Sequence, residues 1–272
     1  MALQSGARFA TAEQVRQEAR AARWKDTTSG QAPGFAQANL VVLPAEHAFE
    51  FTRFCLANPK PCPIMEVLDV GDPVPRMTAP DADVRTDLPG YRIYRHGELV
   101  DEVDDVIREW KEDAVAFLLG CSFTFEEALR EAGISLRHQE LGCTVPMYRT
   151  AMRTRPAGIF HGRVVVSMRP IPAGMVSRAI RITARFPKAH GAPIQVGDPS
   201  ALGIDDLGAP DYGDPVPVAE GELPVFWGCG VTPQSVGLDA KPDWMITHSP
   251  GRMFVTDVRN GELDVLQGEF PG

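Results

Sequence analysis

The sequence lacks the features that would place the chain in a membrane or on nucleic acid. No apolar run approaches the ~20 residues that a membrane-spanning helix needs. Basic residues are outnumbered, since 27 Lys and Arg stand against 36 Asp and Glu and give a formal net charge of −9. Proteins that bind nucleic acid or anionic membranes rely on Lys and Arg. These absences argue against both kinds of partner and leave small molecules and proteins.

Cysteine is scarce and scattered. The five cysteines form no Cys-x-x-Cys pair, and an odd number spread over the chain gives no disulfide framework. The first 24 residues are rich in Ala and Arg and have no central apolar stretch of the kind found in secretory signals. We therefore expect a soluble protein of the reducing cytoplasm.

Several well-known cofactor motifs are also missing. The sequence has no Gly-x-x-x-x-Gly-Lys-[Ser/Thr] phosphate loop, no Gly-x-Gly-x-x-Gly after a strand and no His-Glu-x-x-His. The six histidines are too dispersed to name a metal site. The simplest expectation is an enzyme that uses neither cofactor nor metal.

What the sequence does have is an ordinary globular composition. Its 272 residues are 44% hydrophobic, which is enough for one large domain or two modest ones. Helix and strand patterns alternate over the first half, whereas short strands separated by Gly and Pro dominate from Met147 onward. The mixture predicts an α/β fold. We expect a main three-layer α/β/α domain with a mixed sheet, made of 1–146 and 210–272, and a smaller two-layer α+β domain, made of 147–209.

Four helices follow from local patterns. Capping-box spacing at 11–14 and at 124–127 predicts helices that begin there. A third helix is expected over roughly 45–57, where the prolines that follow end it. The strongest helical spacing of apolar residues runs over 103–117, and Gly120 is well placed to terminate that helix.

Short strands are expected in the first half within 34–44, 64–70 and 91–99, and further strands are expected in the second half. The β-rich runs 162–170 and 177–186 predict an antiparallel pair. Residues 221–230 predict a buried strand, and 244–258 predict a hairpin that turns at 249–251.

The helix expected near Thr124 offers a first candidate site. Ser122 stands just before it, and the unpaired N–H groups of a helix start are a natural seat for a carboxylate. Cys121 lies beside Ser122, and Glu126 lies in the first turn. The alternative is a tight connection between two helices, with a buried Cys121 and a Glu126 that merely favours the helix dipole. Local sequence alone favours this structural alternative.

Two arginines offer a second candidate. Arg149 and Arg169 both follow apolar stretches and should be partly buried. A desolvated guanidinium normally has a carboxylate partner, and a dicarboxylate substrate would supply one. One of the 36 acidic side chains of the protein would serve equally well. The two alternatives have equal support.

The segment 190–199 carries a candidate base. It places His190 and Asp198 at opposite ends of a short strand. Histidine is the side chain best suited to proton transfer near neutral pH. Both residues adjoin glycines, which let the backbone approach a ligand closely. A lone histidine in a loop rich in Gly and Pro is nevertheless more often structural.

The most suggestive stretch follows the strand expected at 221–230. The strand runs into Gly228-Cys229-Gly230, after which Thr232 has the character of a helix N-cap. Such a turn can point backbone N–H groups towards an oxyanion and expose the side chain of Cys229 or Thr232. The alternative is a plain strand-to-helix turn whose cysteine fills core space. Here the functional interpretation is slightly better supported.

Taken together, these segments resemble the hydro-lyase family that is grouped with D-glutamate cyclase. The matching motifs occur in family order: GFAQANLVVLP, NPKPCP, DVRTDLPGYRIYRHGEL, FLLGCSFTFEEAL, VPMYRT, VVSMRP, HGAPIQVGDP, GELPVFWGCGVTPQ and ITHSPGRM. They extend from about Gly34 to Asp257, so nearly the whole chain is covered. The resemblance implies a lyase that eliminates water, with D-glutamate to 5-oxo-D-proline as the best-named reaction.

In that reaction the α-amine attacks the γ-carboxyl carbon and an oxygen leaves as water. The chemistry needs a base, an acid, and fixed donors for the oxyanion. We assign His190, aided by Asp198, as the base and Glu126 as the acid. The oxyanion is expected to be held by the turn after the buried strand, through Gly228, Gly230 and Thr232. The substrate carboxylates are expected to be held by the helix start at Ser122 and by the two arginines, Arg149 and Arg169.

Two other functions remain open. Cys229 could act through an acyl-thioester in a Cys-dependent amidase or lactamase. The chain could also be a metabolite-binding protein without turnover. In each case the expected ligand is a small carboxylate, and homo-oligomers are common among such enzymes.

Overall fold

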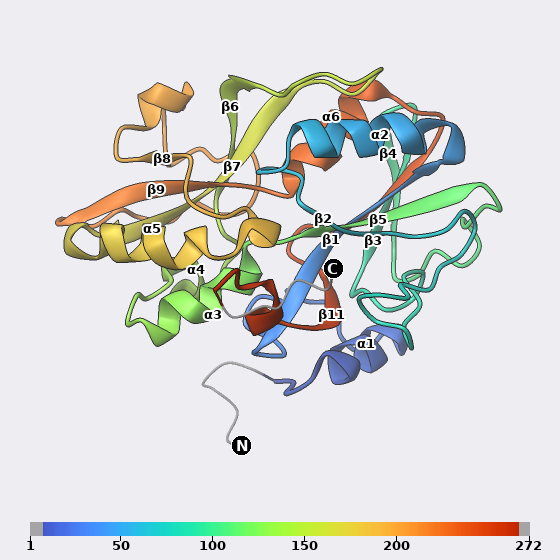
Figure 1. Cartoon of the computed structure of the whole chain (residues 1–272), viewed down its shortest axis with the longest axis horizontal. Coiled ribbons are helices and arrows are strands. Elements are labelled where there is room, and N and C mark those ends of the chain that lie inside the picture. The colour runs from blue at the N-terminus through green and yellow to red at the C-terminus, as the bar shows by residue number, and fades with distance from the viewer. Residues whose placement is uncertain (1–7, 267–272) are drawn as a thin grey trace.

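Two β-sheets organise the chain, of which the computed structural model describes residues 8–266 (Figure 1). The larger sheet has the strand order β2-β5-β1-β10-β3-β4, with β11 also paired to β1, and the smaller has the order β6-β7-β9-β8. The prediction of an α/β chain with two sheets is confirmed. Residues 1–7, the start of the stretch tested above for a secretory signal, lie outside the described part.

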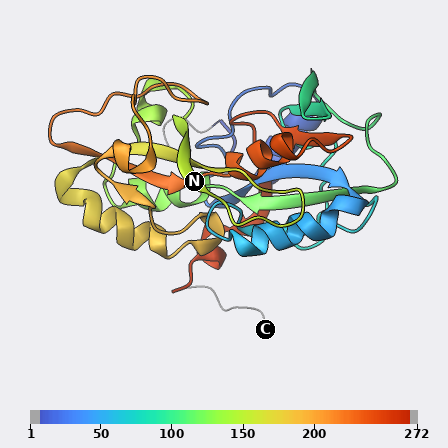
Figure 2. The same cartoon turned by 90° about the horizontal axis from the view of Figure 1, so that it is seen from above.

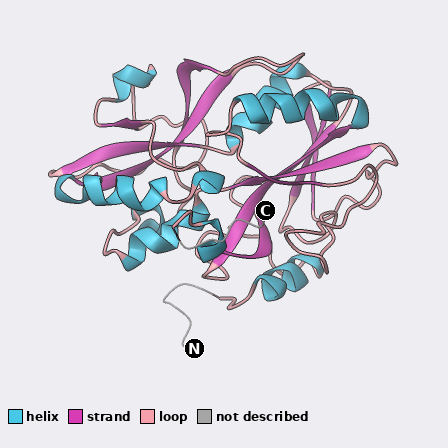
Figure 3. Cartoon of the chain, viewed as in Figure 1, coloured by secondary structure: helices cyan, strands magenta, loops and turns pink. Residues whose placement is uncertain are grey.

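Helices and sheets are distributed as Figure 3 shows. The strands of the larger sheet are β1 (Phe35–Pro44), β2 (Ile64–Val67), β3 (Tyr91–Arg95), β4 (Glu98–Val103), β5 (Ala114–Gly120), β10 (Met245–His248) and β11 (Phe254–Arg259). The strands of the smaller sheet are β6 (Met147–Arg153), β7 (Arg163–Pro172), β8 (Gln195–Val196) and β9 (Glu222–Gly228). The α-helices are α1 (Ala12–Arg20), α2 (Ala45–Ala57), α3 (Phe123–Glu131), α4 (Arg137–Leu141), α5 (Val176–Ala184) and α6 (Val231–Ala240).

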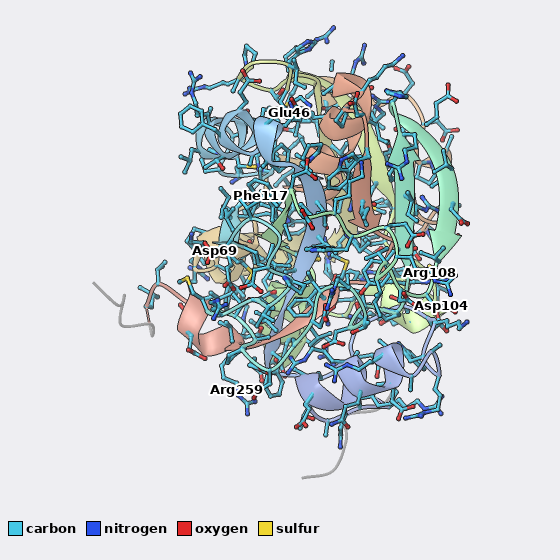
Figure 4. All side chains as sticks on the ribbon, turned by 90° about the vertical axis from the view of Figure 1, so that its right-hand side faces the viewer. Glu46, Asp69, Asp104, Arg108, Phe117 and Arg259 are labelled. Carbon is cyan, nitrogen blue, oxygen red and sulfur yellow. The ribbon has the colours of Figure 1, made fainter. Side chains whose placement is uncertain are left out.

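The larger sheet is buried on both faces at its centre. β1 and β5 pair from Ala38↔Gly120 to Pro44↔Ala114, and all but the first residue of β1 are buried. One face packs against α2 and α6, with Phe51 and Val236 among the contacts. Both helices lie over that face in the side and top views (Figures 1 and 2). Figure 4 shows Phe117 of β5 inside the molecule, whereas Asp104 and Arg108 lie near its edge.

The arrangement of the larger sheet differs from the sequence prediction in two respects. Every strand pairing among the described residues is antiparallel, so the expectation of a mixed sheet was wrong. The second face is covered mainly by loop residues such as Leu68, Ala79 and Leu88, not by a helical layer.

The helix expected over 103–117 is instead the end of β4, a loop and the first part of β5. Every residue of β5 is buried, so its sequence AVAFLLG has apolar side chains on both faces. A short run of this kind does not distinguish a buried strand from a buried helix by periodicity. Pairing with β1 on one side and β2 on the other decides the outcome.

The opposite exchange occurs in the second of the two β-rich runs, which forms a helix instead of the expected strand. Residues 163–172 form β7 as expected, but 177–186 fall mostly in α5. This helix buries Val176, Ala179 and Thr183 against a cluster that includes β7, β9 and α3. Its Ile and Thr residues favour strands locally, and tertiary packing overrides that preference.

The expected hairpin at 244–258 does not form. β10 and β11 do not pair with each other, because both pair with β1 along the same edge. Val41 of β1 opposes Thr247, and Ala38 opposes Phe254, so the two strands form one interrupted line. Residues 249–253 form the connection between β10 and β11 and do not pair with β1.

The N-caps of α1 and α3 can be compared with the two capping boxes predicted from the sequence. Thr11 and Gln14 form the expected capping box of α1. At α3 the N-cap is Ser122 and not Thr124, and it makes no side-chain capping bond.

The connection between the sheets determines the position of the candidate site. β9 lies within 210–272, which the sequence assigned to the main domain, yet its partners are β7 and β8 of the smaller sheet. The ends of β5 and β9, at Gly120 and Gly228, are therefore the points from which the chain crosses between sheets. None of the helices within 8–266 is both long and apolar enough to cross a membrane.

Candidate functional site

Two turns of the same design meet between the sheets. β5 ends at Gly120 and continues through Cys121 and Ser122 into α3, while β9 ends at Gly228 and continues through Cys229 and Gly230 into α6. We call them turn A (120–122) and turn B (228–230). The glycines allow other backbone and side chains to pack directly on the turns. A Cβ on Gly120 would lie 1.7 Å from the carbonyl oxygen of Lys188, and one on Gly230 would lie 2.0 Å from Asn39 Nδ2.

Asn39 of β1 joins the two turns. Its Nδ2 donates to the carbonyl oxygens of Gly120 (3.0 Å) and Leu119 (3.3 Å), and its side chain also lies against Gly230. Asn39 is 3% exposed. Asn39 was not among the site residues predicted from the sequence, although a polar side chain within the apolar strand GFAQANLVVLP was a signal.

Arg169 lies at the centre of the site and is fully buried. Its Nε donates to Glu126 Oε1 (3.0 Å), Nη2 to Ser122 Oγ (2.9 Å) and Nη1 to Ser167 Oγ (3.1 Å). The rings of Phe125 and Trp227 lie 5.3 and 5.5 Å from its guanidinium carbon, within the range of cation–π attraction. The carboxylate partner that the sequence required is thus supplied by the protein itself.

Glu126 is an ionised carboxylate in this network. Its Oε2 accepts from Gln139 Nε2 (2.8 Å), and His138 Nε2 lies 3.2 Å from Oε1. Burial alone would raise the pKa of Glu126, but the charges of His138 and Arg169 and their hydrogen bonds prevail and lower it to about 2. A group with this pKa holds no proton at neutral pH. The assignment of Glu126 as the acid is therefore corrected.

His190 has the properties of a neutral base. Its Nδ1 lies 2.8 Å from the carbonyl oxygen of Lys60, and this contact requires the proton to be on Nδ1. Nε2 then carries a lone pair, and no described group hydrogen-bonds to it. Burial lowers the pKa of His190 to about 4, helped by the charges of Arg169 and Lys60. The residue also adopts φ +76°, a left-handed backbone that is uncommon outside glycine and often found at functional sites.

Asp198 is not the partner of His190. Its carboxylate is exposed and caps the short 3₁₀ helix Pro199–Leu202, accepting from the N–H and the hydroxyl of Ser200 at 2.9 Å each. The strand between the two residues is only β8. The paired role is therefore corrected: the carbonyl of Lys60 orients the His190 ring, and Asp198 closes a turn.

Lys60 is a second residue of the site that was not predicted from the sequence. Its carbonyl contacts His190 and lies 3.1 Å from the position of a Cβ on Gly228, and Asn58 fixes the loop by bonds to the backbone of Arg155. Burial lowers the pKa of the half-buried Lys60 ammonium. No carboxylate of the described residues forms an ion pair with it. The signal was present in NPKPCP, where a lysine stands between two prolines.

Turn B does not expose the groups expected for an oxyanion site. Thr232 Oγ1 accepts from the N–H of Val165 (2.9 Å) and lies 3.2 Å from the Val165 carbonyl oxygen, to which the N–H of Cys229 also donates (3.1 Å). α6 begins at Val231 with Gly230 as its N-cap. Thr232 and the Cys229 amide thus hold turn B to β7, which corrects the role of Thr232. Gly228 and Gly230 remain at the contact with Lys60 and Asn39.

Both turn cysteines are buried thiols. Burial raises the pKa of Cys229 to about 11 and that of Cys121 to about 12, although Arg169 opposes the shift in each case. The nucleophilic form of cysteine is the thiolate. At neutral pH the free protein therefore holds both sulfurs in the protonated form, which disfavours the acyl-thioester route.

Arg149 lies apart from Arg169. It is a partly exposed residue of β6 whose Nη2 lies 3.2 Å from Asp239 Oδ2 on α6, and its backbone N–H donates to Asp211 (2.8 Å). Its partner is thus also a carboxylate of the protein. Within residues 8–266 no group of three or more His, Cys, Asp or Glu residues is arranged to hold a metal ion.

The structure brings together part of the predicted set, namely Ser122, Glu126, Arg169, His190 and turns A and B, and adds Asn39 and Lys60 to it. We call this group of residues the inter-sheet site. Asp198, Arg149 and Thr232 have structural contacts outside it.

Comparison with known proteins gives consistent results along the chain. The family model for D-glutamate cyclase matches residues 115–257, which include both turns, Arg169 and His190. "Putative hydro-lyase GK2103" of Geobacillus kaustophilus is 56% identical over 256 residues, covering 94% of this chain and 97% of the relative. "Putative hydro-lyase" of Rubrobacter xylanophilus is 57% identical over 254 residues, with coverage of 93% and 98%.

A third relative and one solved structure complete the comparison. "Putative hydro-lyase YcsI" of Bacillus subtilis is 55% identical over 239 residues, covering 88% of this chain and 93% of the relative. A nitrogen repressor-like protein from Methanococcus jannaschii aligns over 89% of this chain and 94% of its own, with a TM-score of 0.39 and 11% identity. A structural similarity at that level carries no argument. The sequence relatives confirm the family that the motifs indicated.

Proposed function

The chain belongs to the D-glutamate cyclase family, and from this premise we propose that it eliminates water from a small amino or hydroxy dicarboxylate at the inter-sheet site. The leading reaction is the conversion of D-glutamate to 5-oxo-D-proline. The hydro-lyase names of the relatives support a lyase of this general type. The substrate and the residue roles are our proposal.

The cyclisation is balanced without a further reactant. The α-nitrogen forms a bond to the γ-carbon, and one carbon–oxygen bond of the γ-carboxyl group breaks. Two protons leave the nitrogen and two are added to the departing oxygen, which becomes water. His190 Nε2 can carry each proton in turn, since a neutral imidazole accepts it and the resulting imidazolium returns it. This single shuttle takes over the acid role that Glu126 cannot fill.

The charges of the site suit a carboxylate substrate. The Lys60 ammonium is half-buried near His190 and forms no ion pair with any carboxylate of residues 8–266. A desolvated ammonium of this kind gains from a negatively charged ligand. The positive charge of Arg169, held in place by Glu126, is a fixed electrostatic support for an oxyanion and needs no reorganisation during the reaction.

One observation supports the proposal most strongly: His190 is buried and neutral, its Nδ1 proton is fixed by the Lys60 carbonyl, and its Nε2 has no hydrogen-bond partner among the described residues. A histidine that served only to fill space would not need a left-handed backbone and an unsatisfied ring nitrogen.

All five cysteines are free, which supports the proposed cytoplasmic location.

The proposal is tested by incubating the purified protein with a panel of small amino and hydroxy dicarboxylates, D-glutamate included. Mass spectrometry then detects the loss of one water. We expect turnover of at least one dicarboxylate. If no compound changes while one of them raises the unfolding temperature, the protein is a binder and the lyase proposal fails.

Lys60→Met tests the carboxylate role separately. We expect KM to rise by about tenfold with a smaller change in kcat, because a contact to the bound substrate is lost. Lys111→Met is the control, since the Lys111 ammonium lies over the Trp244 ring and outside the site. An unchanged KM for Lys60→Met would remove this role.

A further inference from the structure

A small polar pocket lies between the segment 30–37, helix α3 and Asn260, which follows β11 (Figure 1). Its enclosed part measures about 20 Å³, and the volume reaches about 270 Å³ when the open mouth is included. A space of about 10–15 Å³ already accommodates one water-sized group. The enclosed part therefore has room for one polar group of that size, such as an ammonium, and the mouth has room for the rest of a small ligand.

Gln37 of β1 contributes a buried carbonyl oxygen to the wall of this pocket. Its Nε2 donates to the carbonyl oxygens of Thr28 (2.8 Å) and Gln31 (3.4 Å), and these bonds fix which end of the amide is the oxygen. Oε1 has no hydrogen-bond partner among the described residues, although Gln37 is only 3% exposed. A buried acceptor without a donor costs free energy, so we expect a ligand that donates a hydrogen bond here.

Asn260 and Arg130 bring two more buried polar atoms to the pocket. Asn260 Nδ2 donates to Glu127 Oε2 (2.9 Å), so the other end of the amide, Oδ1, is again an acceptor. Within residues 8–266 neither Asn260 Oδ1 nor Arg130 Nε has a hydrogen-bond partner. The wall thus offers two acceptors and one donor, and a matching ligand must both donate and accept hydrogen bonds.

The charges around the pocket add a second requirement. In the described part of the chain, the ion pairs made by α3 all belong to Glu126, whose partners are Arg169 and His138. Glu127 and Arg130 lie three positions apart on the same helix and line the pocket, but neither forms an ion pair there. The pocket therefore presents one unpaired negative charge and one unpaired positive charge.

Glu126 and Gln139 separate the pocket from the inter-sheet site. Both residues line the pocket, and Gln139 Nε2 donates to Glu126 Oε2 (2.8 Å) and to Ser29 Oγ (3.2 Å). The other oxygen of the carboxylate, Oε1, accepts from Arg169 Nε (3.0 Å). A ligand in the pocket would thus contact one side of Glu126 while Arg169 holds the other.

We propose that this pocket binds the zwitterionic head group of an α-amino acid. The ammonium enters the enclosed part and donates to Gln37 Oε1 and Asn260 Oδ1, close to the carboxylate of Glu127. The α-carboxylate lies in the mouth and accepts from Arg130, and the amino-acid side chain extends towards solvent. A single water would satisfy the uncharged atoms but leave both charges unpaired, and a simple cation or anion would pair only one of them.

This inference goes beyond the proposed function, because it adds a second binding site that needs no turnover. A head group held while the side chain extends outwards is recognised as a class. We therefore expect the pocket to accept α-amino acids of different side chains, in contrast to the dicarboxylate proposed for the inter-sheet site.

The experiment titrates the full chain with glycine, the smallest α-amino acid, by isothermal titration calorimetry at neutral pH. N-acetylglycine, which lacks the ammonium, and glycinamide, which lacks the carboxylate, are the matched control ligands. We expect saturable binding of glycine and binding weaker by about tenfold or more for each control, since each loses one charged contact. No saturable binding of glycine, or equal binding of the three compounds, would overturn the proposal.

Variants on α3 then locate the binding. Arg130→Met and Glu127→Gln should each weaken the binding of glycine by about tenfold. Glu131→Gln on the same helix and Arg178→Met on α5 are the controls, because both residues are exposed and lie outside the pocket. Unfolding temperatures show that the variants fold. Unchanged binding in both Arg130→Met and Glu127→Gln would overturn the assignment.

Two further variants separate the pocket from the inter-sheet site. Lys60→Met and His190→Gln should bind glycine as the wild-type protein does, because neither residue lines the pocket. Loss of glycine binding in these variants, with normal binding in Arg130→Met, would move the amino acid to the inter-sheet site and overturn the inference. Glycine binding without any loss of water from the dicarboxylates removes the lyase alone, and loss of water without glycine binding removes the pocket alone.

Discussion

Polar groups in the inter-sheet site and in the loop at 68–90 differ in how far along the chain many of their partners lie, although Asp87 of the loop also has a distant partner, Arg20, 67 positions away. In the loop, Asp72 accepts from Arg76 four residues later, and Asp83 accepts from Arg85 two residues later. In the inter-sheet site, Arg169 bonds to a residue 43 positions away, His190 to one 130 away and Asn39 to one 81 away. Local pairs form wherever the chain turns, whereas the long-range pairs exist only when both sheets are complete.

A hollow does not by itself mark the functional region. An open hollow of about 580 Å³ lies in the loop region and is lined by residues such as Asp83, Thr86 and Ile107. Its Asp83 already has an arginine partner. Within the described part of the chain, the inter-sheet site instead contains an imidazole nitrogen without a hydrogen-bond partner and a half-buried lysine without a carboxylate partner. Buried polar groups that lack a partner within the described residues distinguish the site better than an empty volume does.

Removing the central charge should have the largest effect. Arg169→Met leaves Glu126 buried without one of its two cationic partners, His138 and Arg169, which costs about 3–5 kcal/mol of unfolding free energy. Arg85→Met in the loop removes a partly exposed pair and should cost less than about 1 kcal/mol. Urea denaturation measures both. Adding Glu126→Gln to Arg169→Met should recover part of the loss, and equal costs for the two arginines would erase the contrast.

Acid should destabilise the protein through the buried groups of this region. The pKa of His190 is lowered from 6.5 to about 4, so between these values the unfolded chain binds a proton that the folded chain does not. The free energy of unfolding should therefore fall with pH from 6.5 to 4, by about 1.4 kcal/mol per unit for each such group. His248, with its pKa also lowered to about 4 by burial, adds a second proton. Glu126 continues the loss from pH 4.5 to about 2.

Denaturation at a series of pH values checks this expectation. His190→Gln should make the dependence between pH 6.5 and 4 shallower by about one proton. A wild-type stability that does not change over this range would contradict the burial of neutral histidines.

Crowding at the turns should have a smaller effect. Gly230→Ala places a methyl group 2.0 Å from Asn39 Nδ2 and should cost about 1–3 kcal/mol, because the contact that joins the turns must open. Gly174→Ala is the matched control, since nothing lies within 4 Å of its added Cβ and its φ is not in the left-handed region. Thermal unfolding measures both. A Gly230→Ala variant as stable as the control would show that the turns are not closely packed.

The sequence was sufficient for the features that depend on neighbours along the chain. The capping box of α1, the buried strand β9 and the order of the motifs were all readable. The runs 103–117 and 177–186 were misassigned because burial on both faces in one, and packing against β7 and α3 in the other, override local preference.

The same limit applies to the site. His190 and Arg169 could be selected from their residue types, but their partners could not, because Lys60 contributes a backbone carbonyl and Glu126 lies on another element. Asp198 was paired with His190 because it is close in sequence, and its own capping bond to Ser200 was the stronger interaction. Sequence proximity was the wrong criterion for a site built from distant segments.

The most direct test of the account compares two variants in one assay, the loss of water from the dicarboxylate that the wild-type protein turns over. His190→Gln keeps a hydrogen-bonding side chain but removes the proton acceptor, and we predict that kcat falls by about 10²–10⁴. Asp198→Asn changes the residue once paired with it and should leave kcat within about twofold, because it alters only an exposed cap. Full turnover by a folded His190→Gln variant would contradict the central claim.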